Sequence, residues 1–188
     1  SVTSLSDGGF VATWMSAGQD GDETGVYGQR YDSSGVAAGE EFQINTFSAS
    51  GHLRPSVASL NDGGFVVTWT SSGQDGDDFG ISGQRYESSG TAAGEEFQVN
   101  TYTEGWQWYP SVASLSDGGF VVTWESSGQG GIYGQRYDSA GVAAGEEFKI
   151  DTYTGYTGGG DTPSVTSLSD GGFVVTWKIW GEVSSGFG

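Results

Sequence analysis

The residues with the clearest chemical potential are acidic side chains in two short loops that also contain glycine. One loop covers residues 20–23 and the other, 55 positions later, covers residues 75–78. Calcium takes about six to eight oxygen ligands, and carboxylates alternating with glycine let a loop curl around such an ion. The alternative is a solvated acidic turn. We therefore predict calcium binding, with these ligands: Asp20, Asp22, Glu23, Asp75, Asp77 and Asp78.

A second candidate site is the aromatic cluster Trp106, Trp108 and Tyr109. Exposed aromatic rings can pack against sugar rings, so the cluster predicts carbohydrate binding. The alternative is that one or two of these rings fill a gap between structural units. The equivalent stretch 47–54 lacks the cluster, so we do not expect one sugar site in every repeat.

Pairs of glutamates recur along the chain, at 40–41, 95–96 and 146–147. Two carboxylates flanking a glycosidic bond are what a glycosidase uses. A catalytic pair is needed only once, however, and these pairs recur with the repeat. We therefore expect structural contacts between the glutamates and the equally recurrent arginines, and we predict no catalytic residue. The arginines are Arg30, Arg85 and Arg136, and the only histidine, His52, is expected in an exposed loop.

The elements that must position these residues follow from the sequence Asp-Gly-Gly-Phe, which occurs four times. The aspartates are Asp7, Asp62, Asp117 and Asp170, with spacings of 55, 55 and 53 residues. A fixed period of this size indicates a repeat architecture. We divide the chain into repeats 1–55, 56–110 and 111–163 and a partial repeat 164–188 with a divergent C-terminal segment.

Each full repeat reads as four short strands joined by glycine turns, and no helix is expected. In the second repeat we expect the strands at 56–60, 65–70, 81–86 and 95–101. The predicted fold class is all-β, with tandem four-stranded antiparallel β-meanders that resemble the blades of a β-propeller. One tryptophan per repeat is then expected between neighbouring blades: Trp14, Trp69, Trp124 and Trp177. The alternative is an open stacked array of β-repeats or a fibre.

The overall charge limits the partners. The chain has 24 acidic and 6 basic side chains, a formal net charge of −18. Such a surface repels nucleic acid and attracts divalent cations. There is no cysteine, and no apolar run approaches the roughly 20 residues of a membrane-spanning helix, so neither disulfides nor membrane insertion is expected.

The repeat motif Asp-Gly-Gly-Phe-Val-Val-Thr-Trp, followed by Gly-Gln-Arg-Tyr and Gly-Glu-Glu-Phe-Gln-Val-Asn-Thr, resembles tandem repeats of large bacterial secreted and surface proteins. Those proteins are often associated with haemolysin-type calcium-binding modules. The resemblance covers the chain up to Trp177 and implies secretion or a place on the cell surface, with an adhesive role. The haemolysin nonapeptide itself is absent, so its calcium site is not carried over.

From these observations we predict a non-enzymatic, extracellular structural or adhesive protein, with calcium as a stabilising ion. The alternative is a calcium-dependent carbohydrate-binding β-propeller of lectin type. Because the chain starts inside a repeat, we expect a piece of a longer chain. The partial fourth repeat offers an open strand edge unless residues 178–188 cover it, and open edges recruit other chains. We therefore predict a homo-oligomer or filament, whereas glycans are a possible second partner.

Overall fold

The computed structural model describes residues 1–19, 24–47, 51–151 and 161–178, and its regular elements there are all β-strands. The first sheet contains β1 (Val2–Ser4), β2 (Phe10–Ser16), β3 (Gly25–Tyr31) and β4 (Phe42–Gln43). The second contains β5 (His52–Ser59), β6 (Phe65–Ser72), β7 (Phe79–Tyr86) and β8 (Phe97–Gln98). The third contains β9 (Gln107–Ser114), β10 (Phe120–Ser126), β11 (Gly131–Tyr137) and β12 (Phe148–Lys149). A two-stranded sheet contains β13 (Asp161–Ser167) and β14 (Phe173–Lys178).

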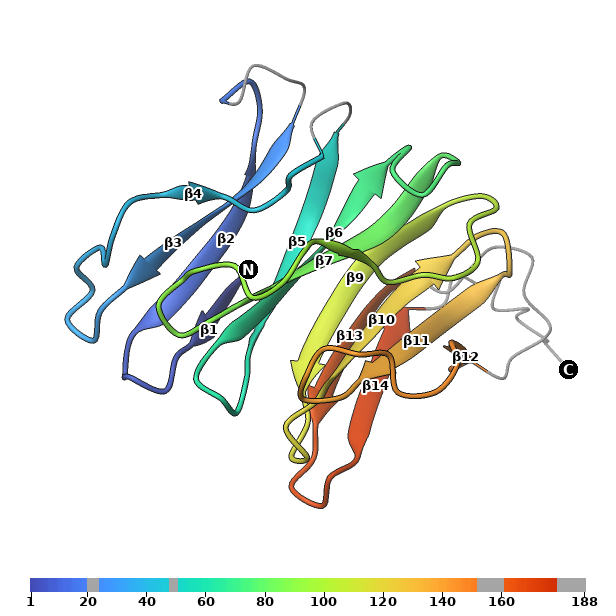
Figure 1. Cartoon of the computed structure of the whole chain (residues 1–188). Coiled ribbons are helices and arrows are strands. Elements are labelled where there is room, and N and C mark those ends of the chain that lie inside the picture. Colours follow the sequence, from blue (N-terminus) through green and yellow to red (C-terminus); the bar gives the residue numbers. More distant parts are fainter. Residues whose placement is uncertain (20–23, 48–50, 152–160, 179–188) are drawn as a thin grey trace, which may run out of the picture.

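The strands of each sheet pair antiparallel and in chain order, so every full repeat is a simple meander. The sheets stand next to one another like the blades of a fan (Figure 1). Their first strands are neighbours: β5 lies beside β9, and β9 beside β13. Because an antiparallel meander alternates direction, the Asp-Gly-Gly turns lie at one end of the sheets. The acidic loops and the connections between repeats lie at the other end, which we call the loop end. This arrangement confirms the predicted all-β fold of propeller-like blades.

The strand bounds of the second repeat differ from the sequence-based expectation mainly in the first and fourth strands. The first strand of the second repeat begins at His52 rather than at Ser56, and the fourth is limited to Phe97–Gln98. The early start of β5 has a bulge at Arg54–Pro55, where the register with β6 shifts. Proline cannot donate to the ladder, so a sequence that places it inside a strand usually indicates a strand end. Here the bulge absorbs the proline and the strand continues on both sides.

The Asp-Gly-Gly turn shows why its glycines are required. In the second repeat Gly63 has a φ of 87°, in the left-handed region that favours glycine. The backbone N–H of Gly64 donates to Oδ1 of Asp62 at 2.9 Å. A Cβ on Gly64 would lie 2.2 Å from the carbonyl oxygen of Tyr86. The turn therefore packs directly against the end of β7, which only a residue without a side chain permits.

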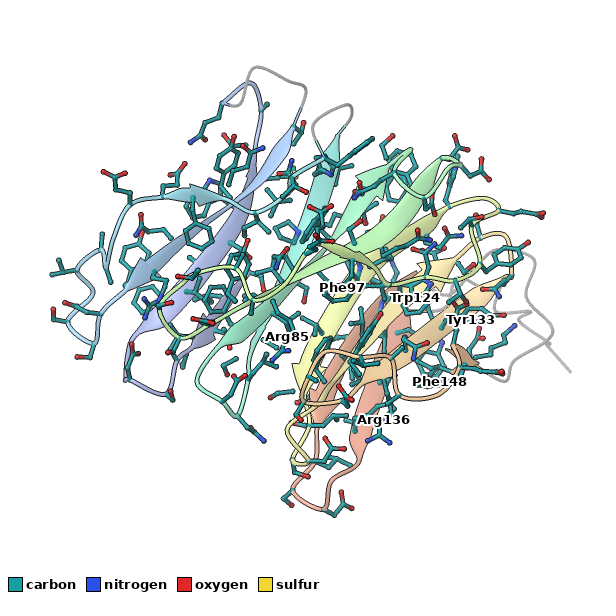
Figure 2. The ribbon with its side chains drawn as sticks, in the orientation of Figure 1. Arg85, Phe97, Trp124, Tyr133, Arg136 and Phe148 are labelled. Carbon is teal, nitrogen blue, oxygen red and sulfur yellow. The ribbon has the colours of Figure 1, made fainter. Side chains whose placement is uncertain are left out.

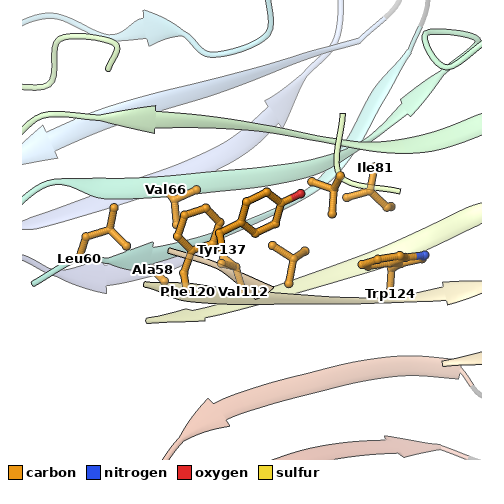
Figure 3. Close-up of a cluster of buried hydrophobic side chains, with 10 residues drawn as sticks. Ala58, Leu60, Val66, Ile81, Val112, Phe120, Trp124 and Tyr137 are labelled. Atoms are coloured by element: carbon orange, nitrogen blue, oxygen red, sulfur yellow. The ribbon is translucent and has the colours of Figure 1, made fainter. Parts of the chain in front are cut away.

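The hydrophobic core lies between the sheets, in three clusters that each join neighbouring repeats. Strand β6 is buried along almost its whole length, as its apolar residues on both faces predict. Trp69 and Trp124 are fully buried in two of these clusters, while Trp14 and Trp177 are half-buried. Figure 3 shows the cluster between the second and third sheets, where Val66 and Ile81 face Phe120 and Trp124. Burial of this apolar surface is the main contribution to holding the blades together.

The recurrent arginines do not contact the glutamate pairs, so that expectation was wrong. Arg85 Nη2 lies 3.1 Å from Oδ2 of Asp62, in the Asp-Gly-Gly turn of the same repeat. Arg30 and Arg136 pair in the same way with Asp7 and Asp117. Figure 2 shows Arg85 and Arg136 toward the turn end of the sheets. This ion pair follows from the strand register. The end of the third strand of each repeat lies beside the Asp-Gly-Gly turn that precedes the second strand.

In the second and third repeats, the second glutamate of the pair instead connects consecutive repeats, whereas Glu41 accepts a hydrogen bond from Gln19 of its own repeat. Oε2 of Glu96 accepts hydrogen bonds from the backbone N–H and the hydroxyl of Thr46, at 2.7 and 2.9 Å. Oε2 of Glu147 does the same with Thr101, at 2.8 and 3.0 Å. Each of these carboxylates therefore clamps its own repeat to the preceding one. This explains why the glutamates recur with the fold.

In the described part of the chain, β14 pairs only with β13. Residues 179–188, which we expected to help cover its other edge, lie outside the described residues. Self-assembly through this edge therefore stays a prediction, and sedimentation of the intact chain would test it. Among the described residues, no helix is long and apolar enough to cross a membrane.

Candidate functional site

The candidate site lies at the loop end, where the second and third repeats meet. It is built from the connection between β6 and β7 and from the segment that enters β9. Trp106 precedes β9 and forms a parallel bridge with Phe79 at the start of β7. Gly73, Gly76 and Gly105 have φ values of 68°, 96° and 72°. These left-handed positions let the two segments turn sharply and meet.

The first strands of three sheets, β5, β9 and β13, carry the same irregularity near this end. Arg54, Tyr109 and Thr162 each precede a proline and have φ values of 57°, 57° and 52°. The ladder register shifts at all three places. A bulge leaves one residue unpaired and re-aims its side chain. Three neighbouring blades therefore present one side chain each from an equivalent bulge.

Four aromatic rings gather beside these bulges and form what we call the aromatic platform, which consists of Phe79, Trp106, Trp108 and Tyr109. Trp108 is the central ring, with its centroid 4.7 Å from that of Phe79, 6.0 Å from that of Trp106 and 5.9 Å from that of Tyr109. The guanidinium carbon of Arg54 lies 4.0 Å from the centroid of Tyr109 and 5.4 Å from that of Trp108. The platform is thus a continuous aromatic surface with a cation stacked on it.

Trp106 is the exposed part of the platform, with 52% of its surface accessible. Its position is nevertheless fixed at both ends. The indole Nε1–H donates to Oδ2 of Asp78 at 2.8 Å, and its backbone N–H donates to Oγ of Ser127 at 2.8 Å. The N–H of Gly105 donates to Oδ2 of Asp77 at 3.0 Å. A large aromatic ring is therefore held in a fixed position at the surface by contacts with two neighbouring loops.

A buried polar network supports the platform from below. Nδ2 of Asn100 donates to Oδ2 of Asp75 at 3.0 Å and to Oε1 of Gln107 at 3.3 Å. Oδ1 of Asn100 accepts the backbone N–H of Ile81 at 2.7 Å. Gln107 is fully buried and is the residue between the two platform tryptophans. The network therefore fixes the start of β9 against β7 and leaves the tryptophans little freedom to move.

The structure divides the predicted calcium ligands into two groups. Asp20, Asp22 and Glu23 lie outside the described residues. Asp75, Asp77 and Asp78 are described, and each accepts a hydrogen bond, from Asn100, Gly105 and Trp106 respectively. In the described ranges, no three His, Cys, Asp or Glu residues are grouped so as to hold a metal ion. Calcium binding stays a prediction, which thermal melting with calcium and with EDTA would test.

His52 is not an exposed loop residue, as we expected, but a buried one in β5, with 1% of its surface accessible. Its Nδ1 lies 3.1 Å from Oγ of Ser71, opposite it in the ladder. The ring of Phe47 approaches its edge at 6.2 Å. The sequence hid this because Pro55 suggested a loop before the strand. Sequence analysis also missed Arg54 as a residue of the site. The available signal was the proline that follows Arg54, Tyr109 and Thr162 at equivalent positions of the repeats.

Comparison with known proteins gives a likeness of fold. No protein-family model matches the sequence, and no curated protein does, so the resemblance to bacterial surface repeats stays a prediction. Among solved structures, a glycoside hydrolase family 43 endo-arabinanase from Bacillus licheniformis matches with a TM-score of 0.61 and 14% identity, over 94% of this chain and 63% of that one. An endo-arabinase from Bacteroides thetaiotaomicron matches with a TM-score of 0.55 and 16% identity, over 94% and 68%. An arabinanase from Bacillus subtilis matches with a TM-score of 0.53 and 14% identity, over 88% and 60%.

The chain therefore spans just under two thirds of the Bacillus licheniformis enzyme, and at these identities the likeness concerns the fold. It nevertheless contradicts the sequence-based prediction of a non-enzymatic structural or adhesive protein, together with its lectin-type alternative, because the proteins that share this fold are glycoside hydrolases. That prediction inferred a structural role from the presence of repeats. The same repeated blades form the framework of enzymes, so repetition alone carries no such conclusion.

Proposed function

We propose that this chain belongs to a glycoside hydrolase-like β-propeller protein and that the aromatic platform holds a glycan. The observation that carries the proposal is Trp106, a ring that is 52% exposed and yet fixed through its indole N–H to Asp78. A fixed aromatic face packs against the C–H face of a sugar ring with little loss of side-chain entropy. Such a ring is therefore suited to bind a saccharide.

The groups around Trp106 suit the hydroxyls of the same sugar. Asp77, Asp78 and Glu104 each place a carboxylate at the loops that hold the ring, and each uses one oxygen in the contacts shown. A carboxylate has two oxygens and about four acceptor positions, so it retains capacity for further donors. Sugar hydroxyls are such donors. An apolar face bordered by acceptors is the usual composition of a small-molecule site.

Hydrolysis of a glycosidic bond needs two carboxylates, one acting as the acid and the other as base or nucleophile. The two carboxylates that we propose for this role are Asp78, which accepts the indole N–H of Trp106, and Glu104, two residues before Trp106 in the sequence. Since solved structures with the same fold are named as arabinanases, arabinan and its oligosaccharides are the first substrates to test. Secretion or display at the cell surface stays a prediction.

The binding test is calorimetric titration of the intact chain with arabino-oligosaccharides. We expect saturable binding that falls at least tenfold in Trp106→Ala, whereas Met15→Ala, which removes an apolar side chain of similar exposure (53%) in the first repeat, binds as the parent does. Equal affinity of the parent and Trp106→Ala, or no binding of any oligosaccharide, would overturn the proposal.

The activity test measures the release of reducing ends from arabinan. We expect release by the parent and its loss in Asp78→Asn and in Glu104→Gln. Because Asn and Gln keep the shape of the side chain, loss of activity with retained binding would indicate chemistry rather than folding. Binding without any release of reducing ends would remove the hydrolytic part of the proposal and leave the binding part.

A further inference from the structure

Among the described residues, Arg54 differs from the other arginines in having no carboxylate partner. Arg30, Arg85 and Arg136 each pair with the aspartate of an Asp-Gly-Gly turn. Lys149 lies 3.7 Å from Asp151. No carboxylate of the described residues lies within 4.0 Å of Arg54, in a chain that carries 24 acidic residues and 6 basic ones. An exposed cation that pairs with no described carboxylate is able to bind an anion from outside.

The geometry of Arg54 leaves its donors free. Its guanidinium stacks over the rings of Tyr109 and Trp108, at 4.0 and 5.4 Å from their centroids. Guanidinium N–H groups point outward in the plane of the group, so stacking on a face does not use them. None of them takes part in a hydrogen bond within the described part of the chain. The stack therefore orients a rigid fork of donors at the edge of the platform.

The fold does not require arginine at this bulge. Tyr109 and Thr162 occupy the equivalent positions with nearly the same backbone, at φ values of 57° and 52° against 57° for Arg54. A left-handed conformation in a residue other than glycine costs free energy, and such costs are typical of functional positions. The strained position is thus kept in each repeat while its side chain changes. This pattern indicates that the side chain at this position is selected by what it contacts and not by the backbone conformation.

We propose that Arg54 makes the aromatic platform selective for a glycan that carries a carboxylate sugar, a uronic acid, beside the residue stacked on Trp106. The inference rests on the proposed function of the platform. A carboxylate fits the guanidinium fork with two parallel hydrogen bonds, and among sugars it is the uronic acids that carry this group. The net charge of −18 repels a polyanion. The ligand is therefore a mainly neutral chain with isolated uronates and not a polyuronate.

The experiment compares three oligosaccharides of equal length by calorimetry at physiological salt: a neutral one, one with a single uronate, and one made only of uronates. We expect the parent to bind the single-uronate ligand about tenfold or more tightly than the neutral one, and the polyuronate less tightly than the single-uronate ligand. Arg54→Gln should remove most of the difference between the first two ligands. Arg54→Thr, the residue that the fourth repeat has at this place, checks that the fold tolerates the change.

Arg136→Gln is the matched control, because it makes the same change of net charge at the turn end of the blade and should retain the preference. Three outcomes separate the proposals. Binding of the neutral ligand with no preference for the uronate overturns the role of Arg54 alone. An equal loss for both ligands in Arg54→Gln does the same. No binding of any of the three overturns the proposed function of the platform and, with it, this inference.

Discussion

Glu147→Ala is the sharpest test of how the repeats are held together. Oε2 of Glu147 accepts two hydrogen bonds from Thr101 of the preceding repeat, at 2.8 and 3.0 Å. A hydrogen bond to a charged group contributes about 1.5–3 kcal/mol where it is shielded from water. These two are exposed, so solvent weakens them, and we expect about 1–2 kcal/mol for the pair. The loss should appear as reduced global stability because the bonds connect two blades.

The assay is urea unfolding followed by tryptophan fluorescence. With a slope of about 2 kcal/mol/M, the expected loss lowers the midpoint by about 0.5–1 M. Glu147→Gln separates charge from shape, since its amide oxygen can take the place of Oε2 without the charge. It should lose about half as much as Glu147→Ala.

Glu146→Ala is the matched control because Glu146 is the exposed neighbour. The free energy of unfolding of Glu146→Ala should differ from that of the parent by no more than about 0.5 kcal/mol, the effect of an ordinary surface substitution. If Glu146→Ala and Glu147→Ala shift the midpoint equally, the glutamate clamp does not stabilise the fold and the reasoning is refuted.

Three further predictions concern other parts of the core and turns. Burial, together with the charge of a nearby glutamate, raises the pKa values of Tyr86 and Tyr137. Their contribution to stability is therefore complete below the unfolded-state pKa of about 10 and is lost as the pH rises further, by about 1.4 kcal/mol per pH unit for each tyrosine. Urea midpoints measured from pH 9 to 12 should fall less in the double Tyr→Phe variant, and parallel curves would contradict the assignment. Gly64→Ala should cost at least about 2 kcal/mol because its Cβ meets a carbonyl oxygen at 2.2 Å, whereas Gly51→Ala, with open space around it, should be neutral or slightly stabilising. Trp124→Ala should cost about 3–5 kcal/mol, since the ring is fully buried between two sheets, and a loss below about 1 kcal/mol would mean that the cluster repacks.

The sequence predicted the local structure well because its signals are local. The Asp-Gly-Gly turns and the alternating apolar residues predict the strands and their order. The fixed period predicts the division into blades. The buried second strand was also predictable, since neither face of β6 carries charged residues. These features depend on neighbouring residues and so are readable from one chain.

The side-chain contacts between strands and between repeats could not be predicted in the same way. Arg85 had both an aspartate and a glutamate pair within its repeat as possible partners, and only the strand register selects Asp62. Glu96 reaches Thr46, 50 residues away, in a different blade. For the candidate site, the tryptophans could be singled out by their type, but Arg54 could not. Its position over Tyr109 depends on a bulge that continues the strand past a proline, where the ordinary rule predicts a strand end.

The clamps also determine how the molecule loses its structure. Glu96 joins the second repeat to the first, Glu147 joins the third to the second, and Arg30 donates to the carbonyl oxygen of Ser89 in the next repeat at 2.9 Å. Because these links connect adjacent blades, the stability of each blade depends on whether its neighbours are folded, as in a one-dimensional cooperative chain. The second blade, which is clamped on both sides, should open last. Amide hydrogens of β6 should therefore exchange with solvent more slowly than those of β2 or β14.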